Sequence, residues 1–382
     1  MITVQKFIEL VDKIYDGEEE LPAILLLGPP GIGKTVSIKT LAKRLANKLG
    51  RQFVDLTEPA TNIEELERNI DRYFIYVGFS VTHVEPTDIS GFPRQVGGYV
   101  SYLPLEYVYL LSHPDAAGVV FLDEITTDNR PDRRSAEFKI LDERQFGFRT
   151  LSKKVLIVAA GNTEEDTSLA EPLPDPILRG RVMIFRIRPP SVEEWIDFMD
   201  REYGNRWDRR IGAFLTRYPD SLWVKAENPE GYEPRLSPRT WTKLARILWR
   251  LREKDADDED IEAIVGAFVS GKEYALLMTF LKTVIPELEE LLRNPRVWTN
   301  LSLEAKYVVT AELSQSDPVM LVEKFYELLN LMAEKDREFL ELLKILIPKE
   351  KRRAYLEQVK RRMPKVWEVY RLNLNRSRDF GL

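Results

Sequence analysis

The sequence predicts an α/β domain built on a largely parallel sheet flanked by helices, followed by an all-α region. Two patterns indicate this. Up to about residue 190, short apolar runs alternate with amphipathic helical stretches, which is typical of βαβ units. Beyond Pro189 and Pro190 the strand signals stop and amphipathic helices follow to the end. The length of 382 residues also exceeds the roughly 100–200 residues of one typical domain.

The expected elements follow from hydrophobic spacing and from Gly and Pro. A helix over 4–15 precedes the first buried strand, 23–27, and a second helix covers 36–49. A further helix is expected over 63–73, in an unusually long connection. Further strands are predicted at 73–81, 118–122, 155–160 and 182–187. Helices beyond residue 190 are predicted at 192–202, 239–253, 260–269, 274–292, 318–332, 337–346 and 352–371.

We therefore expect three parts. Residues 1–190 would form an α/β nucleotide-binding domain and residues 191–290 a helical lid. Residues 291–382 would form a C-terminal helical extension with a basic tail, whose stretch 349–382 holds 11 Lys and Arg against 4 Asp and Glu. The net charge of the whole chain is −6. The tail is either a solvated face, a docking surface for an acidic partner, or a nucleic-acid contact, and we expect nucleotide binding not to need it.

Composition narrows the chemistry. Cysteine is absent, which excludes disulfides, a cysteine nucleophile and thiolate zinc sites. Only two histidines are present, so an ion would be held by oxygen ligands. The N-terminus has no signal-peptide pattern, and no apolar run approaches the length of a membrane span. We expect a cytoplasmic protein without membrane insertion.

A glycine-rich loop gives the strongest functional signal. It lies between a predicted strand and a predicted helix and fits the pattern G-x-x-x-x-G-K-[ST] of phosphate-binding loops. Backbone N–H groups of such a loop surround phosphate oxygens, the lysine reaches the β- and γ-phosphates, and the hydroxyl binds Mg²⁺. The loop comprises Gly28, Pro29, Pro30, Gly31, Ile32, Gly33, Lys34 and Thr35.

Polar residues follow two other predicted strands. Asp123 and Glu124 come directly after the apolar run 118–122, and Asn162 follows the run 155–160. Ligands of open α/β sheets bind at the carboxyl ends of the strands. Asp123 would hold Mg²⁺ together with Thr35, Glu124 would orient or deprotonate the attacking water, and Asn162 would hold that water from the opposite side.

In these motifs the chain resembles the AAA+ ATPases, and within them the MoxR-like branch of the helix-2-insert clade. The resemblance rests on GPPGIGKT, VVFLDEI, ERQFG at 143–147, VAAGNTEED at 158–166 and SPRTW at 237–241, in that order. The segment 85–93, EPTDISGFP, matches the start of the family's inserted hairpin. The similarity covers residues 20–255.

The resemblance implies an ATP- and Mg²⁺-dependent ring, commonly a hexamer, whose sites lie between subunits. Asn162 then corresponds to the sensor-1 asparagine and Arg239 to the sensor-2 arginine. The arginine finger would be Arg181 or Arg179, and we favour Arg181 because it adjoins the last strand. Isolated subunits would be poor catalysts, since a finger from the neighbour neutralises transition-state charge.

The expected function is remodelling or maturation of a protein partner, for which the resemblance points to proteins with a von Willebrand factor A domain. The alternative is a nucleic-acid motor or a GTP-using relative of restriction-linked AAA+ proteins. Two predicted hairpins, 91–99 and 145–148, expose aromatic residues that either contact the substrate or pack on their own subunit.

Overall fold

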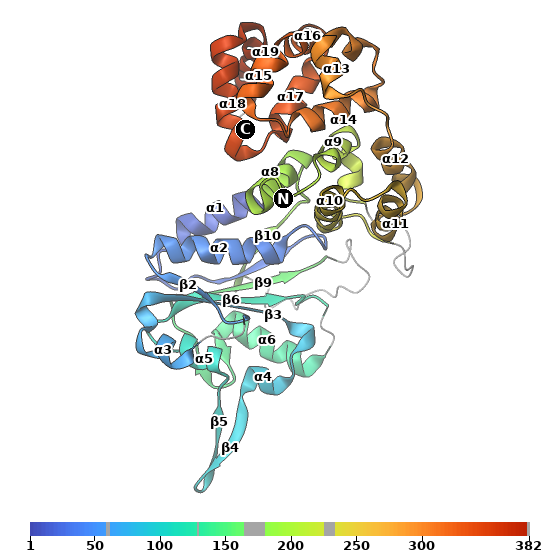
Figure 1. The fold of residues 1–382 in the computed structure, drawn as a ribbon. Helices are drawn as coiled ribbons and strands as arrows, with labels where there is room; N and C mark the ends of the chain where they lie inside the picture. Colours follow the sequence, from blue (N-terminus) through green and yellow to red (C-terminus); the bar gives the residue numbers. More distant parts are fainter. Residues whose placement is uncertain (59–61, 128–129, 164–179, 225–233, 380–382) are drawn as a thin grey trace. The chain divides into compact units, whose positions relative to one another are not determined.

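The computed structural model describes residues 1–58, 62–127, 130–163, 180–224 and 234–379 (Figure 1). The chain forms two compact units, Met1–Pro189 and Pro190–Leu382. No helix within the described ranges is both long and apolar enough to cross a bilayer.

The first unit is built on a six-stranded sheet in which all neighbours are parallel, in the order β10-β1-β9-β6-β3-β2. This confirms the predicted parallel sheet. Because every strand runs the same way, all carboxyl ends lie at one edge. The strands are β1 Ala23–Leu27, β2 Gln52–Asp55, β3 Tyr73–Ser80, β6 Ala117–Asp123, β9 Val155–Gly161 and β10 Val182–Arg186.

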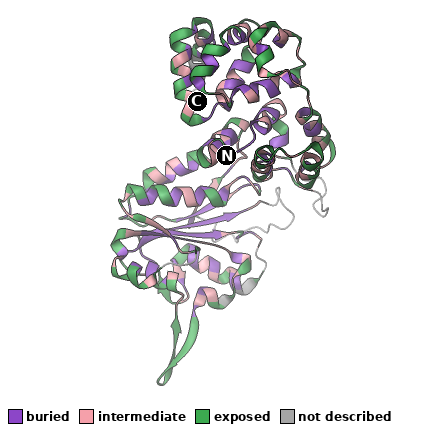
Figure 2. Cartoon of the chain, in the orientation of Figure 1, coloured by how far each residue is buried: buried purple, intermediate pink, exposed green. Residues whose placement is uncertain are grey.

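Helices cover both faces of this sheet, so the central strands are buried on both sides (Figure 2). Helices α1 and α2 lie on one face, and α3, α5 and α6 lie on the other (Figure 1). The helices are α1 Val4–Ile14, α2 Lys34–Lys48, α3 Ile63–Arg68, α4 Pro86–Ser90, α5 Glu106–Leu111 and α6 Pro131–Glu143. The α/β fold class and the helical region after it are both confirmed.

The connection after α2 differs from the prediction. It contains the short edge strand β2, which the sequence did not reveal because only Phe53 and Val54 are apolar in its four residues. The helix expected over 63–73 is shorter: α3 ends at Arg68, a 3₁₀ turn covers Ile70–Arg72, and Tyr73 already begins β3.

Both predicted hairpins are present. Strands β4 Phe92–Val96 and β5 Tyr99–Leu103 pair around Gly97 and Gly98, and all ten strand residues are exposed (Figure 2). The smaller hairpin pairs β7 Gln145–Phe146 with β8 Arg149–Thr150. An isolated two-stranded hairpin is marginally stable in water, so the exposed surface of the larger one calls for a functional explanation.

The second unit is all-α, as predicted. Two of the long predicted helices are interrupted where proline removes a backbone donor, before Pro286 and Pro364, and a third is divided at Phe325. Helices α9 and α14 were not predicted. The helices are α8 Val192–Tyr203, α9 Arg209–Arg217, α10 Pro238–Arg252, α11 Asp258–Phe268, α12 Gly271–Leu281, α13 Leu288–Arg293, α14 Leu303–Leu313, α15 Pro318–Lys324, α16 Tyr326–Lys335, α17 Arg337–Leu346, α18 Lys349–Arg362 and α19 Pro364–Asp379.

One hydrophobic core runs through this unit from Trp195 to Tyr370. Tyr355, Val359 and Met363 of the basic tail are fully buried in it. The core crosses residue 290, and the division into a lid and an extension stays a prediction. The tail is thus a structural part of the helical unit.

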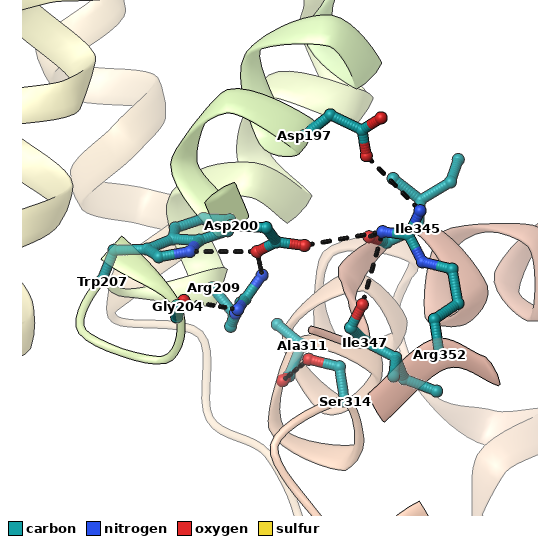
Figure 3. Close-up of polar contacts among 10 residues, drawn as sticks. All are labelled: Asp197, Asp200, Gly204, Trp207, Arg209, Ala311, Ser314, Ile345, Ile347 and Arg352. Carbon is teal, nitrogen blue, oxygen red and sulfur yellow. Dashed lines mark hydrogen bonds and ion pairs between the residues drawn. The ribbon is translucent and has the colours of Figure 1, made fainter. Parts of the chain in front are cut away.

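A buried ionic cluster joins α8 to α18 (Figure 3). The Asp200 carboxylate accepts hydrogen bonds from Arg209 and from the Trp207 indole, and an Arg352 nitrogen lies 3.5 Å from its other oxygen. Arg352 also donates to the Ile345 carbonyl at 2.8 Å. Burial raises the pKa of Asp200, and the guanidinium groups of Arg209 and Arg352 oppose that rise.

Four of the eleven Lys and Arg residues of the tail face acids of other helices in the same unit. Lys349 and Arg352 face Asp197 of α8 at 3.6 and 3.4 Å. Arg362 pairs with Glu323 of α15, and Lys365 lies 2.6 Å from Glu334 of α16. The structure therefore supports intramolecular docking of the tail on acidic helices.

Arg352→Ala should lower the unfolding free energy of the helical unit by about 1–3 kcal/mol, because one Asp200 oxygen loses its cation in a buried site. Arg353→Ala is the control: its side chain is 90% exposed, and among the residues that the structure describes it pairs with Glu357 alone, so the change should stay within about 0.5 kcal/mol. All seven tryptophans lie beyond residue 190, so tryptophan fluorescence in urea reports on this unit alone. Equal effects of the two substitutions would contradict the role of the cluster.

Candidate nucleotide-binding site

The phosphate-loop sequence folds into the turn that its glycines predict. Gly31 and Gly33 have φ of 78° and 94°, in the left-handed region that glycine adopts without strain. At Gly28 a Cβ atom would lie 2.5 Å from the Ile187 carbonyl oxygen, so only glycine fits there. Helix α2 begins at Lys34, and its free N–H groups and positive dipole end border the loop. The loop is shaped to receive an anion.

The Lys34 ammonium lies inside this loop and is buried. It donates to the carbonyl oxygens of Gly28 and Pro29 at 2.6 and 2.9 Å and to the Asn162 amide oxygen at 2.9 Å. Asn162, which the sequence placed after the strand at 155–160, therefore contacts the phosphate-loop lysine directly. A cation held among neutral oxygens is well suited to attract phosphate.

Thr35 and Asp123 also meet, as the predicted Mg²⁺ site requires. The Thr35 hydroxyl donates to the Asp123 carboxylate at 2.7 Å. A hydroxyl and a carboxylate this close fit a hard cation that prefers oxygen, and Mg²⁺ commonly takes only one or two protein groups beside water and phosphate. These two residues would hold the ion.

Glu124, the expected catalytic carboxylate, sits in an unusual backbone conformation. Its φ is 62°, which costs an L-residue about 1–2 kcal/mol. The Ser80 and Thr82 hydroxyls both donate to one oxygen of its carboxylate. Strain at a non-glycine residue often marks a functional position. Here the strained residue is an acid that directly follows β6.

Ser80 and Thr82 are site residues that the sequence analysis missed. Ser80 ends β3 and lies opposite Asp123 in the parallel register. Thr82 follows in a 3₁₀ turn, and Arg133 of α6 holds that segment by donating to the Thr82 and Val84 carbonyls. The available signal was a hydroxyl residue at the end of a predicted strand, the same signal that identified Asn162.

Of the three predicted arginines, Arg181 lies in the described part of the first unit. Arg181 precedes β10 and forms an ion pair with Asp142 of α6. Since Val182 pairs with Ala23 at the start of β1, Arg181 lies at the amino edge of the sheet, opposite the phosphate loop. Arg239 is exposed in the first turn of α10, in the second unit. Arg179 lies outside the described residues.

The fold and this site define a phosphate-loop nucleotide-binding α/β unit. Residues 24–85 match the family model described as ATPase family associated with various cellular activities (AAA). The matched residues lie within the first unit and include the phosphate loop.

Similarity to individual proteins is more limited. A stretch of 174 residues is 30% identical to the Lon protease of Metamycoplasma arthritidis (strain 158L3-1), covering 42% of this chain and 17% of that protein's length. Cdc6p from Pyrobaculum aerophilum is 17% identical with a TM-score of 0.39, over 94% of this chain and 84% of its own. Orc1 from Aeropyrum pernix, solved in complex with DNA, is 14% identical with a TM-score of 0.36, over 89% and 80%. These scores are too low to assign a function to this chain.

Glu124→Gly should be more stable than Glu124→Ala by about 1 kcal/mol, because both remove the carboxylate but only alanine retains the left-handed strain. Thermal unfolding followed by far-UV circular dichroism measures the difference, while tryptophan fluorescence separately follows the helical unit. At an unstrained position the alanine variant is at least as stable as the glycine variant. If Glu124→Ala is as stable as Glu124→Gly or more stable, residue 124 is not strained.

Proposed function

We propose that this protein is a Mg²⁺-dependent ATPase of the AAA+ type that works as a MoxR-like ring. One observation carries the proposal: Lys34, Asn162 and the Thr35–Asp123 pair converge by direct hydrogen bonds at the carboxyl edge of the sheet. Glu124 adjoins them on the same strand end. This set provides a phosphate cradle, an ion site and a candidate base.

The chain's own residues divide the work. Lys34 leaves the loop carbonyls and offers its charge to the β- and γ-phosphates, while Asn162 orients the attacking water. The Glu124 carboxylate first releases its hydrogen bonds from the Ser80 and Thr82 hydroxyls. It then accepts a hydrogen bond from that water and takes its proton. Bound Mg²⁺ would neutralise charge on the phosphate oxygens.

Assembly would complete the site. Arg181 is separated from its own phosphate loop by the length of β1, and this separation supports a role for its guanidinium in a neighbouring subunit. To reach the γ-phosphate bound by the neighbouring subunit, the Arg181 guanidinium would have to leave its ion pair with Asp142. We propose a homo-oligomeric ring, hexameric as in the family that the sequence resembles, with Arg181 as the finger and Arg239 as sensor 2.

The chemistry of the large hairpin favours a protein partner over nucleic acid. Within residues 91–104 the only charged residue is Arg94. The exposed apolar side chains are Phe92, Val96, Tyr99, Val100, Tyr102 and Leu103. Nucleic-acid affinity depends on several phosphate contacts from Lys and Arg, which this hairpin lacks. We infer that the ring remodels or matures a protein client, of which a von Willebrand factor A domain protein is one candidate.

Lys34→Ala should abolish nucleotide binding because the phosphates lose their charge partner. Glu124→Gln should bind ATP as the parent does and hydrolyse it at least ~10²-fold more slowly. Binding of a fluorescent ATP analogue and phosphate release, with ATP and with GTP and with and without DNA, measure both steps. If Glu124→Gln hydrolyses ATP at the parent rate, the catalytic assignment is wrong; a preference for GTP or stimulation by DNA would favour the restriction-type or nucleic-acid alternative.

Arg181→Ala should bind ATP normally yet lose hydrolysis. Mixing it with Lys34→Ala subunits should restore activity above that of either variant, because some interfaces then join an intact loop to an intact finger. Arg179→Ala measured in parallel tests the choice between the two arginines. Normal hydrolysis by both arginine variants would refute a finger supplied in trans from this segment.

A further inference from the structure

The two hairpins of the first unit meet and enclose a pocket of about 310 Å³. We call it the inter-hairpin pocket; its main lining residues are Ile89, Tyr102, Val108, Phe146, Phe148 and Arg149. Its volume lies at the lower end of the roughly 300–1,000 Å³ of ligand pockets. It is therefore sized for a single large side chain.

The pocket has a rigid apolar floor. Ile89 of α4, Val108 of α5 and Phe146 of β7 are each at most 3% exposed. Phe146 packs edge-to-face on Tyr107, with ring centroids 5.7 Å apart. These residues belong to the core beneath the hairpins, so the floor exists before a ligand arrives.

Two exposed aromatic rings form the walls. Phe148 is 76% exposed, yet its ring centroid lies 5.1 Å from that of Tyr102 on the other hairpin. The Lys139 ammonium lies 6.0 Å from the centroid of the Phe148 ring. Gly147 brings the turn so close to α4 that a Cβ atom would lie 2.5 Å from the Ser90 carbonyl oxygen. The walls are held in place, although they face solvent.

The rim is cationic. Arg149 lines the pocket, and within the described part of the chain its guanidinium makes no ion pair or hydrogen bond. No Asp or Glu is among the residues lining the pocket. A pocket with an apolar floor, aromatic walls and a guanidinium in its lining complements an apolar side chain that has a carboxylate beside it.

We propose that the inter-hairpin pocket binds an aromatic or large aliphatic side chain of the protein client, in an extended segment where an acidic residue adjoins it. This inference rests on the proposed function, because it names what that function's client presents to the ring. Arg149 selects the acidic neighbour, and Tyr102 and Phe148 enclose the apolar side chain.

The test uses the full chain, labelled and applied to a positional-scanning array of hexapeptides. We expect enrichment of peptides with an aromatic or large aliphatic residue next to Asp or Glu. Phe148→Ala should weaken binding of the enriched peptides at least about tenfold. Arg149→Glu should change the preferred neighbour from acidic to basic.

Two residues of the larger hairpin provide matched controls. Tyr99→Ala removes an exposed aromatic ring and Arg94→Glu reverses a charge, and neither residue lines the pocket. Both should leave peptide preference unchanged. Enrichment that survives Phe148→Ala and Arg149→Glu, or an array with no enriched peptide, would overturn the pocket.

A further arm separates the nucleic-acid alternative. If oligothymidylate binds and Arg149→Glu abolishes that binding, the aromatic walls stack bases and the proposal is wrong. ATP hydrolysis measured on the same variants distinguishes the two levels of failure. If the peptide test fails but the protein hydrolyses ATP, only the proposal for the pocket is wrong. If the unmodified chain does not hydrolyse ATP, the ATPase assignment itself is wrong.

Discussion

The parallel register of four neighbouring strands is the constraint on which the site depends. Strands β1, β9, β6 and β3 end at one edge, so the phosphate loop, Asn162, Asp123 and Ser80 meet there although they are far apart in sequence. Close strand packing maintains this register. At Gly118 a Cβ atom would lie 2.1 Å from the Ile75 carbonyl oxygen, so a larger residue would separate β6 from β3.

The same register gives the two edges of the sheet different roles. The carboxyl edge gathers the groups that would bind and cleave a nucleotide, and the amino edge carries Arg181. If Arg181 is the finger that we propose, its distance from its own phosphate loop means that a neighbouring subunit must complete the site. The Arg181–Asp142 pair gives that guanidinium a partner within the chain, which limits the cost of keeping it away from a phosphate.

The sequence predicted the site residues correctly where a motif directly followed a clear apolar strand pattern. The phosphate loop, Asp123 and Asn162 each follow a continuous apolar run, and all of them fall at the expected edge. Prediction failed where the signal was short or mixed. Strand β2 offers two apolar residues, and α9 contains Gly212, which weakens the helix signal because glycine disfavours helix interiors. Ser80 and Thr82 were missed because a hydroxyl at a strand end is also an ordinary turn residue.

The basic tail shows how charge patterning misleads when the partner is the chain itself. In sequence, eleven cations against four acids leave three interpretations open: a solvated face, a docking surface for an acidic partner, or a nucleic-acid contact. In the structure, Lys349, Arg352, Arg362 and Lys365 face acids of α8, α15 and α16, which contribute to the excess negative charge of the remaining chain. Pairing of this kind reduces the positive field that would attract a polyanion. The main sequence argument for a nucleic-acid partner is therefore weakened by the fold, while the weakly charged, apolar hairpins remain as the surface that needs a partner.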